Sequence, residues 1–151
     1  MTRYLIAYFA AAIVFLGSDA VWLGVVAKDL YRAQIGHLLA QDFRIGPAAV
    51  FYLMYVAGIV YFAIAPALAS GRWQDALLPG AVLGFLAYGT YDFTSWSVMR
   101  DWPAGITFID LAWGTVLTMV ASAAGAGSAR QPPGGEGTSL AAPIAVWVRN
   151  R

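Results

Sequence analysis

The sequence has no cysteine and only one histidine, His37, among its 151 residues. Disulfides, thiolate metal sites and cysteine nucleophiles are therefore excluded, and one imidazole is too few for a histidine-rich metal site. We accordingly expect no metal and no cofactor. The net charge of +1 offers no basic surface of the kind that nucleic-acid binding requires.

Charged residues are also scarce. Asp, Glu, Lys and Arg make up 11% of the chain, whereas 60% of it is hydrophobic. A soluble domain carries about 25% charged residues, so this chain has too few of them to cover a water-facing surface. The length is that of a single domain. We therefore expect an integral membrane protein that is surrounded by the lipid bilayer.

Four apolar stretches cover residues 4–27, 47–69, 75–99 and 104–124. Each is about as long as the roughly 20 residues that a helix needs to cross the hydrocarbon core. Their length and lack of strict alternation predict helices rather than barrel strands. The first stretch is too long for the apolar core of a signal peptide, which favours a retained span. The predicted fold class is all-α, an integral membrane bundle of four transmembrane helices.

Two segments lie outside the predicted spans. Apolar residues recur at helical spacing in the first loop, which predicts a short interfacial helix there; the alternative is a solvent-facing loop with a buried stripe. The residues on this face are Tyr31, Ile35, Leu38 and Leu39. Residues 125–151 are rich in Gly, Pro, Ser and Ala, which predicts a flexible C-terminal tail after a transmembrane domain over residues 1–124.

Three aspartates interrupt the apolar stretches: Asp19 in the first, Asp92 in the third and Asp110 in the fourth. A charged carboxylate costs about 2.5–3.5 kcal/mol in lipid on insertion scales, so such residues are functional by default. With about 1.5 Å of rise per residue and alternating helix direction, all three are expected about 5–7 Å from the bilayer centre, towards the first loop. The sequence therefore predicts one acidic layer.

Aromatic and polar residues accompany each aspartate at one-turn spacing. An indole N–H can donate to a carboxylate, and aromatic rings can line a pocket, so we predict an intramembrane ligand-binding pocket. The predicted pocket residues are Asp19, Trp22, Tyr88, Asp92, Ser95, Trp96, Asp110 and Trp113. The predicted counter-charges on the first-loop side are Lys28, Arg32, His37 and Arg100. Tyr52, on the uncharged second span, is interpreted as a packing or interfacial residue.

Four motifs in order carry a resemblance to a known family. They are Ser18-Asp19-Ala20-Val21-Trp22-Leu23, Tyr31-Arg32 with Gly36-His37-Leu38-Leu39, Tyr88-Gly89-Thr90-Tyr91-Asp92-Phe93-Thr94, and Asp110-Leu111-Ala112-Trp113-Gly114. Over residues 3–124 the chain resembles the uncharacterised bacterial membrane proteins of domain of unknown function 2177. The resemblance implies a four-helix, multi-pass protein of the bacterial inner membrane and no established activity. Family members often have Asn where this chain has Ser95, which removes one amide ligand.

The acidic layer is compatible with three functions. The first is binding or transport of a small cationic or amphipathic ligand, with a homodimer for transport because one four-helix copy is small. The second is an accessory or scaffold subunit of a larger membrane complex, in which the acids join helices by hydrogen bonds. The third, and least supported, is an enzyme that acts on a lipid through two carboxylates. Cations near the spans divide almost equally between the two sides, so the membrane orientation stays open.

Overall fold

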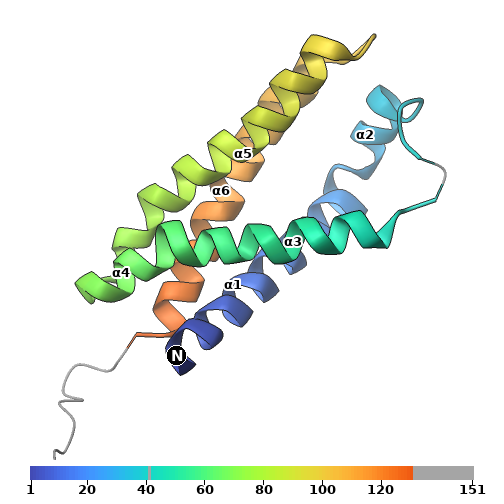
Figure 1. Ribbon diagram of the computed structural model, residues 1–151. Helices are drawn as coiled ribbons and strands as arrows, with labels where there is room; N and C mark the ends of the chain where they lie inside the picture. The colour runs from blue at the N-terminus through green and yellow to red at the C-terminus, as the bar shows by residue number, and fades with distance from the viewer. Residues whose placement is uncertain (41, 131–151) are drawn as a thin grey trace, which may run out of the picture.

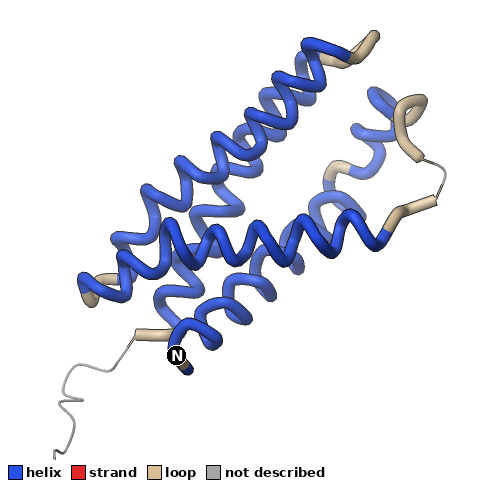
Figure 2. Tube along the Cα trace, in the orientation of Figure 1, coloured by secondary structure: helices blue, strands red, loops and turns tan. Residues whose placement is uncertain are grey.

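The computed structural model describes residues 1–40 and 42–130, which are helical almost throughout and contain no strand (Figure 2). Three continuous helices are long and apolar enough to cross a membrane: Thr2–Val26, Ile45–Ser70 and Ala104–Ser128. The first consists of α1 (Thr2–Val21) and a π-helical turn, Trp22–Val26. The second consists of α3 (Ile45–Ile59), a π-helical turn (Val60–Ile64) and α4 (Ala65–Ser70), and the third is α6 (Ala104–Ser128).

The fourth span is α5 (Leu77–Val98), which follows a 3-10 turn over Trp73–Ala76. Its 22 residues extend about 33 Å at 1.5 Å per residue, enough to cross the hydrocarbon core. It is less apolar than the other three because its sequence includes Gly, Tyr, Thr and Ser residues in addition to Asp92. Figure 1 shows α5 running antiparallel to α6 along most of its length. The predicted four-helix membrane bundle is confirmed.

Small residues allow α5 and α6 to approach closely. A Cβ atom on Gly84 would overlap the backbone of Gly114, and one on Gly80 would overlap the side chain of Ser122. Lipid removes most of the hydrophobic driving force between membrane helices, so close backbone packing of this kind is a principal source of their association. At Gly80 and Gly84 the seam leaves no room for a larger residue.

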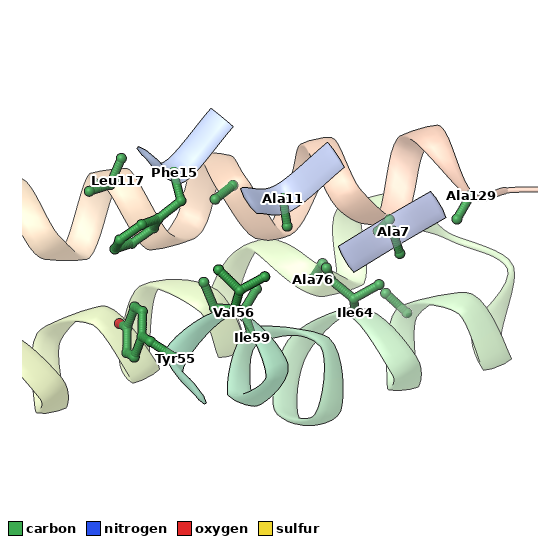
Figure 3. Packing of buried hydrophobic residues seen from close by; sticks show 13 residues of the cluster. Ala7, Ala11, Phe15, Tyr55, Val56, Ile59, Ile64, Ala76, Leu117 and Ala129 are labelled. Carbon is green, nitrogen blue, oxygen red and sulfur yellow. The ribbon is translucent and has the colours of Figure 1, made fainter. Parts of the chain in front are cut away.

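Buried side chains of α1, α3, the following π-helical turn and α6 form the main apolar core (Figure 3). On α1 the buried residues recur every fourth position, as Ala7, Ala11 and Phe15. Asp19 is the next residue in this row and is buried as well. Because residues four apart share a helix face, the packing of α1 turns Asp19 into the bundle.

The last helix is longer than predicted. α6 runs to Ser128, beyond the predicted end of the fourth span at Ala124. Gly125 is buried in this extension, and a Cβ atom there would collide with the side chain of Ile64 and crowd the backbone of Ala7. Small residues thus serve as packing residues here rather than as the start of a linker. The rest of the predicted tail, from residue 131 on, lies outside the described residues.

The predicted helix of the first loop is present as α2 (Lys28–Ile35). It is shorter than the predicted apolar face, because it ends at Ile35 and Leu38 beyond it is exposed. Ile35 is buried against Trp102 and Ile106, where α6 begins. α2 therefore packs on the end of the bundle at which the chain passes from α5 to α6.

Candidate functional site

All three intramembrane aspartates are buried in the bundle. Asp19 is 5% exposed, Asp92 is 0% exposed and Asp110 is 7% exposed. Asp110 lies close enough to both Asp19 and Asp92 for the charges to interact. Within the described residues, the three carboxylates do not form a group that could hold one metal ion.

Asp19 joins three helices by hydrogen bonds. Its carboxylate accepts a bond of 2.7 Å from the Tyr52 hydroxyl on α3 and one of 3.2 Å from the Trp113 indole on α6. Tyr52 packs against the apolar core, as interpreted from the sequence, and its hydroxyl is in addition a donor to the acid. The second span carries no charge of its own, and its Tyr52 supplies one of the two donors to the acid.

Asp110 accepts a hydrogen bond from the hydroxyl of Tyr31 on α2. The Trp22 indole donates to the same hydroxyl at 3.4 Å. Burial, together with the bond to Asp110, raises the pKa of Tyr31 above its ordinary value near 10, so the phenol keeps its proton at neutral pH. Tyr31 is a site residue that the sequence did not reveal, and it fixes α2 to α6.

The two bonded aspartates belong to one network. The rings of Trp22 and Trp113 stack with centroids 4.3 Å apart and an angle of 9° between their planes. Trp113 donates to Asp19, and Trp22 donates to the Tyr31 hydroxyl that bonds Asp110. The stacked indoles therefore connect the acid of α1 with the acid of α6.

Asp92 differs from the other two acids because neither of its carboxyl oxygens has a hydrogen-bond partner among the described residues. It is fully buried on α5, within electrostatic range of Asp110 and of Tyr31. Leaving a buried polar group unpaired costs about 1–3 kcal/mol, and more if the group is charged. Asp92 is therefore the position at which this site has unused bonding capacity.

Two predicted neighbours of Asp92 lie beside it on α5. The Tyr88 ring, one turn before it, packs directly on Gly114 of α6, where any Cβ atom would overlap the ring. Ser95, one turn after it, is 5% exposed. These residues continue the α5–α6 seam to the level of the acids.

Other predicted residues stand outside the site. Trp96 is 42% exposed; it stacks on Phe93 and meets Phe108 edge to face on the outside of the bundle. The predicted counter-charges are exposed, and within residues 1–40 and 42–130 none pairs with a buried aspartate: Lys28, Arg32, His37 and Arg100.

An apolar cleft lies between α3 and α5. One part has a volume of about 370 Å³ and a second, more open part about 740 Å³, and Phe51 lines both. Tyr88 and Tyr91 form the α5 wall of the smaller part. No carboxylate lines either part, and Tyr88 is in electrostatic range of Asp19 and Asp110. Tyr88 therefore both lines the apolar cleft and lies near two of the acids.

The profile of the family described as predicted membrane protein, DUF2177, matches residues 4–127. The chain belongs to this family. The matched range covers the four spans, except for the first two residues of the first and the last residue of the fourth, and the whole acidic region of this DUF2177 protein, and it confirms the resemblance seen in the motifs. No curated protein and no solved structure gave a match.

Proposed function

We propose that this DUF2177 protein binds a small amphipathic cation between its helices, with the cationic group at Asp92 and Asp110. The observation that carries the proposal is the state of Asp92: it is fully buried and unbonded, beside a second buried acid. A ligand ammonium group supplies both the hydrogen-bond donors and the positive charge that this position needs.

The surroundings of Asp92 suit the rest of such a ligand. Asp19 and Asp110 already accept bonds from the protein, so Asp92 is the acid left for an added donor. Tyr88 and Tyr91 flank it and present aromatic rings to the apolar cleft. Aromatic faces attract cations by about 0.5–2 kcal/mol and also accommodate apolar groups. The proposed ligand is therefore cationic at one end and apolar or aromatic at the other.

The test uses 2-phenylethylammonium as the probe and the uncharged 2-phenylethanol as its control, with the protein in lipid nanodiscs. Asp92→Asn should weaken probe binding about tenfold or more, as expected for loss of a charged hydrogen bond. Asp75→Asn is the matched control, because Asp75 is an exposed acid paired with Arg72 at 3.6 Å. Equilibrium dialysis gives the affinities. Equal binding in all three proteins, or equal binding of the alcohol, would contradict the proposal.

Movement of the cation across the membrane is a separate step. Uptake of the probe into proteoliposomes should exceed that of protein-free liposomes and should fall in Asp92→Asn. Binding without uptake would make the protein a binding protein rather than a transporter. We propose that the protein lies in the bacterial cell membrane, a location that the family resemblance supports. We also propose that a homodimer carries out the transport.

A scaffold or accessory subunit is the second candidate, and the bonding of Asp19 favours it. This acid joins α1 to α3 and α6, as expected of a polar group that holds membrane helices together. If this is its whole role, Asp19→Asn should lower thermal stability and leave probe binding unchanged. Purification in mild detergent would then recover a larger partner in fixed proportion.

A further inference from the structure

A second hollow lies at the opposite end of the bundle from α2. The beginning of α1, the end of α4 and the end of α6 meet there, as Figure 1 shows around the N-terminus. The hollow has a volume of about 120 Å³. Its lining includes two arginines, one tryptophan and several small residues: Arg3, Ala67, Gly71, Trp73, Ala126 and Arg130.

The lining is cationic. No carboxylate lines the hollow, and within the described part of the chain neither Arg3 nor Arg130 forms an ion pair. Arg3 is oriented by its neighbour: it donates to the Tyr4 hydroxyl at 3.2 Å, and its guanidinium lies 5.0 Å from the centre of that ring. Arg72 lies in sequence between two lining residues, Gly71 and Trp73, but it pairs with Asp75 and does not itself line the hollow.

The position of the hollow is that of lipid headgroups. Three membrane-crossing segments begin or end beside it, at Thr2, Ser70 and Ser128. Trp73 in its wall is half-buried against the apolar core, a location typical of tryptophan at the membrane interface. A water molecule takes about 30 Å³, so the hollow holds the equivalent of about four waters. That is room for a phosphate group and not for a whole lipid.

We propose that this hollow binds the phosphate group of an anionic membrane lipid through Arg3 and Arg130. Guanidinium groups match phosphate oxygens in geometry as well as charge. The N-terminus of α1 favours an anion, whereas the C-terminal ends of α4 and α6 oppose one, so the arginine charges must supply the net attraction. The acyl chains of the lipid would lie along the exposed apolar face of α1, which includes Leu5 and Phe9.

The test is native mass spectrometry of the full chain with phosphatidylglycerol, phosphatidylcholine and diacylglycerol of the same acyl chains. The wild type should retain phosphatidylglycerol best and diacylglycerol, which lacks the phosphate, least. Arg3→Gln with Arg130→Gln should weaken phosphatidylglycerol binding roughly 30-fold, as two cations near a membrane surface contribute. Phosphatidylglycerol binding by Arg72→Gln should stay within about twofold of the wild type, because Arg72 is paired with Asp75 and does not line the hollow.

Several results would overturn the proposal. They are unchanged phosphatidylglycerol binding in the double variant, an equal loss in Arg72→Gln, and equal retention of diacylglycerol by the wild type. Inorganic phosphate that competes with phosphatidylglycerol at similar concentrations would reassign the hollow to free phosphate. The lipid comparison uses unsubstituted protein, so it decides even if the double variant does not fold.

Discussion

Replacing Asp92 and Asp19 by valine should change the stability of the protein in opposite directions. Valine and aspartate have similar helix propensities, so the helix term is small at both sites. At Asp92 the substitution removes two buried oxygens that have no partner, which should raise the free energy of unfolding by about 1–3 kcal/mol. At Asp19 it leaves two half-buried donors, Tyr52 and Trp113, unpaired, which should lower that free energy by about 2–4 kcal/mol.

The assay is unfolding of the detergent-solubilised protein by added sodium dodecyl sulfate, followed by circular dichroism without ligand. The two variants should differ by at least about 3 kcal/mol, the sum of the two lower bounds. Asp92→Asn keeps a buried polar group of the same shape and should stay close to the wild type. Changes of the same sign at both positions would refute the distinction between a bonded and an unbonded acid. A loss above about 2 kcal/mol in Asp92→Val would show that Asp92 is held by bonds.

Two further predictions concern the seam and α2. Gly114→Ala should lower the free energy of unfolding by about 2 kcal/mol, because the new methyl group overlaps the Tyr88 ring. Gly17→Ala, where nothing lies within 4 Å, should raise it by about 0.5–1 kcal/mol in the same dodecyl sulfate unfolding assay; equal effects would contradict the close packing of the seam. The protonated Tyr31 hydroxyl bonds Asp110 and so stabilises α2. Because the pKa of Tyr31 is raised in the folded protein, this contribution should be complete below pH of about 10 and should be lost as the pH rises above that value. Amide exchange in α2, corrected for intrinsic rate, should therefore quicken above pH 10 and should be fast already at neutral pH in Tyr31→Phe; unchanged protection in this variant would show that the Asp110 bond does not hold α2.

The fold could be predicted because the bilayer allows few solutions. A long apolar run must be a helix whose backbone groups bond internally, and the four runs gave the four spans. The burial of Asp19 follows the same reasoning, since an acid must turn away from lipid. The end of α6 was misjudged because alanine and glycine indicate a linker in water but also close packing between membrane helices, as at Gly125.

The pairing of side chains across helices could not be read from the sequence. Helices that are apolar all round carry no strong periodic signal of which face turns inward. For that reason the sequence does not identify Tyr52 as a donor, and Trp96, a predicted pocket residue, lies 42% exposed on the outside of the bundle. One signal was available for Tyr52: a buried acid needs donors, and the tyrosines of the uncharged second span were at hand.

The π-helical turn over Trp22–Val26 means that the number of residues, and not only their identity, positions α2. This turn is closed by a bond of 2.8 Å from the Ala27 amide to the Trp22 carbonyl, and it accommodates one residue more than an α-helical turn would. If the same residues formed an α-helical turn instead, everything that follows would be shifted by about one residue position, or roughly 100° around the helix axis. Tyr31 would then point away from Asp110, although every side chain of the network was still present.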